Sequence, residues 1–213
     1  MLELMTIGTQ GPSASKTLAL IQASVGMIEQ ISGGAVSPRG TASVSTDSSW
    51  WPSVGSKVFD LTNGGLIVKD TPNFSEADTY TIEFWVLGTN TRRAFLSKGG
   101  ALASYFNLSA ARTWTLVSQD QDKRTWVGYA TFDWQHIAIT SSPAGSDVFL
   151  GGTKRYTSPK PLAWGSPDND LIVGFDPTAT LYGNSKFDQI RISNVVRYTA
   201  DFTPEYNKPF VID

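Results

Sequence analysis

Carboxylate side chains are the first residues to examine, because hydrolysis of a glycosidic bond needs one carboxyl group as acid and a second as nucleophile or base. On a β-strand, two such groups share a face only when they are two or four residues apart. Glu83 has no acidic partner in its strand, and the pair Asp120 and Asp122 lies among charged neighbours typical of a solvated loop. We therefore expect no enzymatic activity and interpret Glu83 as an exposed or hydrogen-bonded sheet residue.

The chain has a single histidine, His136, and no cysteine. These counts exclude a His-rich metal site, a cysteine-ligated zinc site, a disulfide framework and a thiol nucleophile. A Ser-His-acid triad would also need a nucleophilic serine, and no nucleophile-elbow motif is present. We therefore predict that His136 is a structural residue whose hydrogen bonds are met within a sheet.

Three aspartates in neighbouring predicted loops, Asp168, Asp170 and Asp176, are weak candidates for calcium, which needs several oxygen ligands around one point. Their spacing is not that of an EF-hand, so we favour solvated turns and predict no cofactor.

The 17 basic and 19 acidic residues give a net charge of -2. Because the sequence also has no Gly-rich phosphate loop and no basic cluster, we predict neither a nucleic-acid nor a membrane partner.

Seven tryptophans are many for a chain of 213 residues. Exposed aromatic faces stack on sugar rings, and Trp114, Trp126 and Trp164 lie in or near predicted loops and sheet edges. Trp164, between Pro161 and Pro167, is the favoured candidate for a sugar platform. The alternative is that most of these tryptophans belong to the core of the domain.

The composition is that of one large folded domain: 40% of the residues are hydrophobic, 12% are aromatic and 17% are charged. From residue 46 onward, short runs of alternating polarity are separated by Gly, Pro, Asn and Asp clusters, a pattern typical of β-strands joined by turns. The predicted strands span residues 57–61, 65–68, 79–87, 94–98, 105–109, 113–118, 125–129, 134–141, 147–150, 170–175 and 185–193. This set predicts an all-β, two-sheet antiparallel jelly-roll sandwich over residues 46–213.

Alternation within two of these strands predicts which side chains face the core. In residues 79–87, the alternate residues from Tyr80 to Val86 face the core, and Glu83 lies on the other side. In residues 185–193, simple alternation puts Phe187, Gln189 and Arg191 on one face and the even-numbered residues on the other.

Residues 1–45 contain no aromatic residue, and we treat them as a separate N-terminal arm or linker. Leu18, Ile21, Val25 and Ile28 have helical spacing, which predicts a short amphipathic helix. This helix could lie on the main domain or dock on another subunit as an assembly arm, and a flexible tail is the third alternative. Residues 32–49, rich in Gly, Ser and Thr, are interpreted as linker or irregular coil.

Three pairs of segments share a recognisable strand pattern. They are VFDL (58–61) with YTIEFWV (80–86), WQHIAIT (134–140) with VFLGG (148–152), and LIVG (171–174) with FDQIRIS (187–193). In order and spacing they resemble the laminin-G-like branch of the concanavalin A-like jelly rolls. Gly151 departs from the pattern, because the family usually has Asp at that point of the hairpin. The resemblance covers residues 58–206 and implies a concanavalin A-like fold.

The closing stretch RISNVVRYTADFTP (191–204) resembles the end of such domains in structural proteins of tailed bacteriophages. This resemblance implies a virion protein, such as a capsid decoration, head fibre, baseplate or tail-fibre component. It would contact other virion proteins, form a homo-oligomer and use residues 1–45 for docking. The alternative is a carbohydrate-binding, lectin-like module that recognises a host surface glycan, and the two roles can coexist.

The expected location is the virion, assembled in the host cytoplasm. Residues 18–31, the longest apolar-leaning stretch, are too few and too polar to span a bilayer. The first fifteen residues include Glu3 but neither Lys nor Arg, so we expect no signal peptide.

Overall fold

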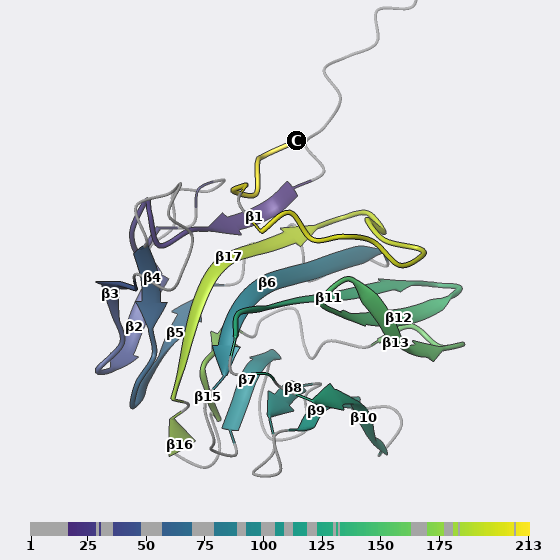
Figure 1. Cartoon of the computed structure of the whole chain (residues 1–213), viewed down its shortest axis with the longest axis horizontal. Helices are drawn as coiled ribbons and strands as arrows, with labels where there is room; N and C mark the ends of the chain where they lie inside the picture. Colours follow the sequence, from purple (N-terminus) through teal and green to yellow (C-terminus); the bar gives the residue numbers. More distant parts are fainter. Residues whose placement is uncertain are drawn as a thin grey trace, which may run out of the picture.

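The described strands form two antiparallel sheets stacked face to face (Figure 1). The computed structural model describes residues 17–28, 30, 36–47, 57–69, 79–88, 93–98, 105–108, 113–118, 123–129, 131, 133–162, 170–176, 181–182, 184–206 and 208–213. Within these ranges every regular element is a β-strand, which confirms the predicted all-β, two-sheet sandwich. No helix in them has the length and hydropathy needed to traverse a lipid bilayer.

The first sheet has eight strands among the described residues, in the order β13, β12, β11, β6, β17, β4 and β3, with β1 also paired to β17. Their bounds are Thr17–Ile21 (β1), Ser43–Thr46 (β3), Lys57–Asp60 (β4), Tyr80–Gly88 (β6), Gln135–Ser142 (β11), Gly145–Leu150 (β12), Thr153–Ser158 (β13) and Ser185–Ser193 (β17). The two nine-residue strands, β6 and β17, lie side by side at its centre and position the site described below.

The second sheet has seven strands in the described ranges, in the order β10, β9, β8, β7, β14, β5 and β2. Their bounds are Val36–Gly40 (β2), Gly64–Val68 (β5), Arg93–Lys98 (β7), Tyr105–Leu108 (β8), Thr113–Ser118 (β9), Lys123–Tyr129 (β10) and Leu171–Val173 (β14). Phe175–Asp176 (β15) and Leu181–Tyr182 (β16) form a short separate ribbon.

The main hydrophobic core lies between the two sheets. The alternate residues of β6 from Tyr80 to Val86 belong to it, as the sequence predicted, together with Leu66 and Leu96 of the second sheet. Thr81, Glu83 and Trp85 point to the outer face of β6, yet all three are buried. Strand β6 is therefore covered on both faces, so another part of the chain must pack on the outside of the first sheet.

The predicted amphipathic helix is wrong, because residues 17–21 form strand β1. This strand runs antiparallel to β17, with Ile21 opposite Ile190. Ile21 is fully buried, whereas Val25 and Ile28 are 51% and 44% exposed, so these side chains do not form one apolar face. Strand β4 pairs with β17 only at residues 186 and 187, and β1 satisfies the backbone groups beyond that point.

The predicted linker also contributes strands to the sandwich. Strand β2 pairs with β5 in the second sheet, and β3 pairs with β4 in the first. In the described structure, β1, β2 and β3 are therefore parts of the sheets, and a boundary at residue 45 does not separate them from the sandwich.

The alternation predicted for β17 is wrong because the strand contains a β-bulge. Its register against β6 shifts between Asp188 and Arg191, and the intervening Gln189 adopts a left-handed conformation with φ 55°. The additional residue reverses the alternation. As a result Ile190 joins the core, and Arg191 lies on the outer face opposite Glu83.

A left-handed backbone is uncommon for a residue with a side chain, so Gln189 must be held by its surroundings. Its side-chain oxygen accepts hydrogen bonds from the backbone N–H of Phe210, at 2.8 Å, and from the amide of Gln22. Phe210 belongs to the last part of the chain, so the bulge and that part stabilise each other.

Residues 194–206 and 208–213, here called the C-terminal segment, cross the outer face of the first sheet (yellow in Figure 1). The backbone N–H of Phe202 donates to the carbonyl of Gly152 at 2.9 Å, in the turn between β12 and β13. Gly152 has φ 79°, and a Cβ at this position would clash with the Phe202 carbonyl oxygen. Glycine is therefore required here both for its backbone conformation and for the close approach of the segment.

The position of β1 in the core gives a stability prediction. We expect Ile21→Ala to lower the free energy of unfolding by about 2–5 kcal/mol, because it leaves a cavity in the hydrophobic core. Val25→Ala, at an exposed position on the same predicted helix face, should change it by no more than about 0.5 kcal/mol. Urea unfolding of both variants tests this, and equal small effects would contradict the placement of β1.

Candidate functional site

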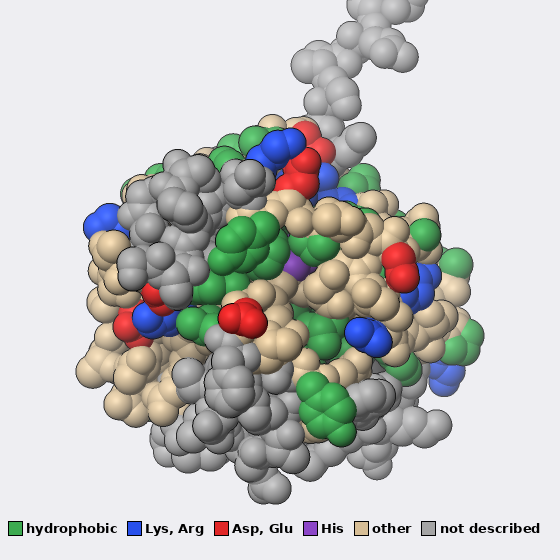
Figure 2. All heavy atoms as spheres, in the orientation of Figure 1, with side chains coloured by type: hydrophobic (Ala, Val, Ile, Leu, Met, Phe, Trp, Pro, Cys, Tyr) green, Lys and Arg blue, Asp and Glu red, His purple; other side chains and the backbone are tan. Residues whose placement is uncertain are grey.

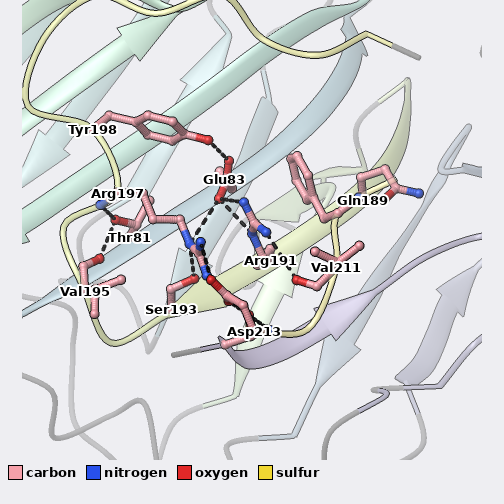
Figure 3. A network of polar contacts seen from close by, with 12 residues as sticks. Thr81, Glu83, Gln189, Arg191, Ser193, Val195, Arg197, Tyr198, Val211 and Asp213 are labelled. Atoms are coloured by element: carbon pink, nitrogen blue, oxygen red, sulfur yellow. Dashed lines mark hydrogen bonds and ion pairs between the residues drawn. The ribbon is translucent and has the colours of Figure 1, made fainter. Parts of the chain in front are cut away.

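A buried carboxylate, Glu83, forms the centre of a polar network on the outer face of the first sheet (Figure 3). Arg191 donates to Oε1 of Glu83 from Nε at 2.8 Å and from Nη2 at 2.7 Å. The Tyr198 hydroxyl donates to Oε2 at 2.7 Å, and Nε2 of His136 lies 3.2 Å from the same oxygen. Both oxygens of Glu83 are thus occupied by protein partners.

Strand pairing brings these side chains together. The bulge in β17 sets Arg191 directly opposite Glu83 of β6. On the other side of β6, His136 of β11 is opposite Trp85 and therefore diagonal to Glu83 on the same face. Tyr198 comes from the C-terminal segment, so the network joins three strands to the segment that covers them.

The surroundings keep Glu83 ionised. Burial is the largest single influence and by itself raises the pKa of the Glu83 carboxyl. The hydrogen bond with His136, the positive charge of Arg191 and the bond from Tyr198 outweigh burial, so the pKa lies below its ordinary value. Burial and the neighbouring charge of Glu83 raise the pKa of Tyr198, which therefore keeps its proton and donates it to the carboxylate.

A second ion pair ties residue 213 to the same region. Arg197 donates from Nη2 to Oδ1 of Asp213 at 2.5 Å and from Nε to the hydroxyl of Ser193 at 2.6 Å. Its hydrogen bond to Asp213 lowers the pKa of that carboxyl. The hydroxyl of Thr17, in β1, also donates to Asp213, so β1 and the C-terminal segment are joined at this point.

Among the described residues, only one ring nitrogen of His136 has a hydrogen-bond partner, whereas the sequence predicted a fully hydrogen-bonded residue. Its ring is 2% exposed and has aromatic neighbours in edge-on contact, with Trp85 at 5.2 Å, Phe202 at 5.6 Å and Phe210 at 5.9 Å between ring centroids. Nε2 is bonded to Glu83, but Nδ1 is buried and has no hydrogen-bond partner among the described residues. Such a group is uncommon in native proteins and calls for an explanation.

A pocket of about 320 Å³ lies between the C-terminal segment and the first sheet. We call it the C-terminal pocket. Its lining consists of His136 and Arg191 from the sheet, Tyr198, residues 202–205 and residues 208–211. The histidine, purple in Figure 2, is visible among hydrophobic side chains near the centre of this face. The pocket therefore combines apolar walls with a few polar groups, as ligand sites do.

Of the three tryptophans predicted as sugar platforms, only Trp114 has a described side chain. Trp114 is fully buried in β9 and its indole N–H donates to Gln135 at 3.0 Å, so its prediction as a platform is wrong and the core alternative holds for it. Trp126 lies on β10, but its side chain is outside the described residues, and Trp164 is outside them altogether. Trp164 and Trp126 stay predictions.

Of the three predicted calcium candidates, only Asp170 has a described side chain. Asp170 forms an ion pair with Lys69 at 3.0 Å. Asp168 and the side chain of Asp176 lie outside the described residues. Within the described ranges, no group of three or more His, Asp or Glu side chains could hold a metal ion.

Sequence reasoning missed the C-terminal pocket. Each of its parts was visible separately: a lone acid in an apolar strand, a lone histidine in the next, and aromatic residues after the closing strand. Without the bulge, Arg191 would face away from Glu83, so alternation alone could not bring the charges together.

Comparison with known proteins identifies the class of the domain. A laminin-G family model, described as the concanavalin A-like lectin/glucanases superfamily, matches residues 60–201. Because this match covers more than half of the chain, the protein belongs to that superfamily. No curated protein matches the sequence.

Several solved structures share the fold at low sequence identity. Domain 4 of AbnA, a GH43 extracellular arabinanase from Geobacillus stearothermophilus in complex with arabinotriose, has a TM-score of 0.63 and 14% identity, over 84% of this chain and 92% of that domain. The binding domain of Paraclostridial Mosquitocidal Protein 1 has a TM-score of 0.60 and 12% identity, over 86% of this chain and 49% of that one. Botulinum neurotoxin type C, which interacts with two ganglioside molecules, has a TM-score of 0.61 and 12% identity, over 84% and 48%. The chain therefore spans almost all of the arabinanase domain and about half of each toxin chain.

The Glu83 network gives a prediction about stability and pH. Glu83→Gln leaves Arg191, which is 8% exposed, without its counter-charge, so we expect the free energy of unfolding to fall by about 3–5 kcal/mol at neutral pH. The pKa of Glu83 is lowered on folding, so its contribution is complete above its unfolded pKa of about 4.3 and is lost as the pH falls through the folded value. Urea unfolding of both proteins between about pH 3 and pH 7 should show the difference shrinking at the acidic end.

The matched control is Glu205→Gln, which removes an exposed ion pair with Lys208 and should change stability little at any of these pH values. A wild-type to Glu83→Gln difference that stays constant down to the lowest pH would contradict the role given to the carboxylate.

Proposed function

We propose that this chain is a carbohydrate-binding, lectin-like module. The observation that carries the proposal is the C-terminal pocket of this lectin-type domain, whose lining combines apolar walls with a histidine that has one ring nitrogen without a hydrogen-bond partner among the described residues. Sugars are recognised by this combination, because a sugar ring has apolar C–H faces and hydroxyl groups at its edge. The complex of the arabinanase domain with arabinotriose supports the same class of ligand.

The state of Glu83 favours binding over glycoside hydrolysis. A catalytic carboxyl must reach the scissile bond, either as acid or as nucleophile. Both oxygens of Glu83 are engaged by Arg191, His136 and Tyr198 beneath the C-terminal segment. This carboxylate thus supports the fold, and we propose that the domain is not an enzyme.

A glycan array tests the function. The full-length chain should bind at least one glycan saturably, and saturation-transfer NMR should confirm that interaction in solution. On the same array, Trp164→Ala tests whether the predicted platform contributes, and Lys160→Ala, at an exposed position of the described structure, is a surface control. A folded protein that binds nothing on a broad array would refute the proposal.

The resemblance of residues 191–204 to the ends of phage domains supports a second proposal, that the module is displayed on a tailed-phage virion. The same residues supply part of the C-terminal pocket, including Arg191, Tyr198 and Phe202. A glycan-binding domain on a particle surface would serve adsorption to a host. Oligomerisation and contacts with other virion proteins stay predictions.

Quantitative peptide mass spectrometry on gradient-purified particles from the source tests the virion proposal. We expect the chain in clean particles, at a copy number near that of the major capsid protein for a shell decoration, or at a few copies for a tail or fibre component. Its absence would reject the virion role and leave the glycan-binding proposal intact.

A further inference from the structure

The hydrogen bonding of His136 fixes which of its nitrogens can meet a ligand. Nε2 lies 3.2 Å from a Glu83 oxygen that is kept ionised by its surroundings. A carboxylate only accepts, so Nε2 carries the proton and donates it. In the neutral ring, Nδ1 then has a free lone pair and needs a donor. No described residue supplies that donor, although the nitrogen is buried.

The C-terminal pocket has the size and walls for a small ligand with an apolar face. Its volume of about 320 Å³ is at the lower end of the range of about 300–1,000 Å³ found for small-molecule sites. Phe202 and Pro204 line it on one stretch of the segment, and Pro209 and Phe210 line it on the other. The space suits one sugar residue better than several.

The charges around the pocket favour a neutral ligand. Arg191 is paired with Glu83, and Lys208 is paired with Glu205 at 2.7 Å. Among the described residues that line the pocket, each Lys, Arg or Glu side chain thus has a partner of opposite charge. A carboxylate or phosphate on the ligand would find no unpaired cation here, whereas a hydroxyl can donate to Nδ1.

We propose that the C-terminal pocket binds a single neutral sugar residue, such as the end of a glycan chain, with one hydroxyl donating a hydrogen bond to Nδ1 of His136. The sugar ring packs against the apolar walls formed by Phe202 and Phe210, and its remaining hydroxyls reach the Lys208 and Glu205 pair at the rim. This proposal rests on the proposed glycan-binding function and adds where the sugar lies, how much of it is held and which atom recognises it.

Because His136 is the only histidine, its two ring nitrogens can be observed without ambiguity in the full chain labelled with ¹⁵N-histidine. The probes are methyl β-D-galactopyranoside, methyl α-D-glucopyranoside, arabinotriose and, as an acidic comparison, N-acetylneuraminic acid. Long-range ¹H–¹⁵N spectra distinguish the two ring nitrogens in the free protein and report which of them carries a proton, and a proton on Nδ1 would overturn the proposed acceptor. A sugar that binds should shift the Nδ1 resonance and move Nε2 much less.

Two variants and a control separate the pocket from the rest of the surface. His136→Gln keeps an amide donor for Glu83 but has no second ring nitrogen, so binding should weaken about tenfold. Thr203→Trp, at an exposed residue of the pocket lining, fills the space and should weaken binding by at least about tenfold even if the histidine variant does not fold. Ala144→Trp adds the same ring in the exposed turn between β11 and β12 and should bind like the wild type.

The outcomes distinguish the two proposals. If the array detects glycan binding that Thr203→Trp does not weaken, the pocket is the wrong site and the proposed function stands. A saturating sugar that leaves Nδ1 unmoved overturns the hydrogen bond, and tighter binding of N-acetylneuraminic acid than of the neutral sugars overturns the ligand class. Absence of binding to any probe or arrayed glycan overturns both proposals.

Discussion

The ionised carboxylate of Glu83 is the constraint on which the outer face of the first sheet depends. A charge taken out of water is tolerated only when it is paired and its remaining hydrogen-bonding capacity is met. Arg191 supplies the counter-charge from β17, and Tyr198 and His136 supply the remaining bonds to its second oxygen. Tyr198 comes from the C-terminal segment, so the segment must lie across the sheet for the carboxylate to be satisfied. The polar network thereby specifies where the segment packs, while the apolar contacts of Trp85 and Trp134 with Phe210 contribute burial beside it.

The bulge at Gln189 is the backbone feature that makes this pairing possible. A regular β17 would turn Arg191 towards the core, where a guanidinium would lack partners, and would leave Glu83 without its counter-charge. The left-handed conformation of Gln189 is unfavourable by itself, by about 1–3 kcal/mol for such a residue. This unfavourable conformational free energy is offset by the hydrogen bonds of Gln189 with Phe210 and Gln22 and by the ion pair that the bulge permits. A locally unfavourable residue is therefore retained because three separate segments of the chain depend on it.

The sequence was sufficient for the parts of the fold that rest on simple periodicity. Strands with clear alternation, such as β6 and β11, were predicted to within about two residues, and the superfamily was recognised from their order.

Prediction failed for elements whose conformation is determined by tertiary contacts and not by local periodicity. Residues 17–21 form a strand because β17 has an unpaired edge there, and the helical spacing of Leu18, Ile21, Val25 and Ile28 carries no information about that edge. Strand β13, with its charged and polar residues, was missed because an outer strand needs no apolar pattern. The pocket was missed because its residues come from β11, β17 and the C-terminal segment, which only the bulge and the packed segment bring together.

The same network that holds the segment also prepares the group that we propose as the sugar contact. Glu83 bonds Nε2 of His136, and this leaves Nδ1, which has no partner among the described residues, in a fixed orientation. The imidazole is bonded to Glu83 and lies in edge-on contact with aromatic rings, so little side-chain freedom has to be lost when a ligand binds. A buried ion pair is often a weak source of stability compared with apolar packing of the same volume. The Glu83–Arg191 ion pair is better explained if the network also positions His136. Apolar residues in its place would keep the sheet covered but would no longer hold the imidazole in a fixed orientation. Folding of the C-terminal segment and formation of the pocket are therefore one event, and a change that weakens the ion pair should weaken the proposed site with it.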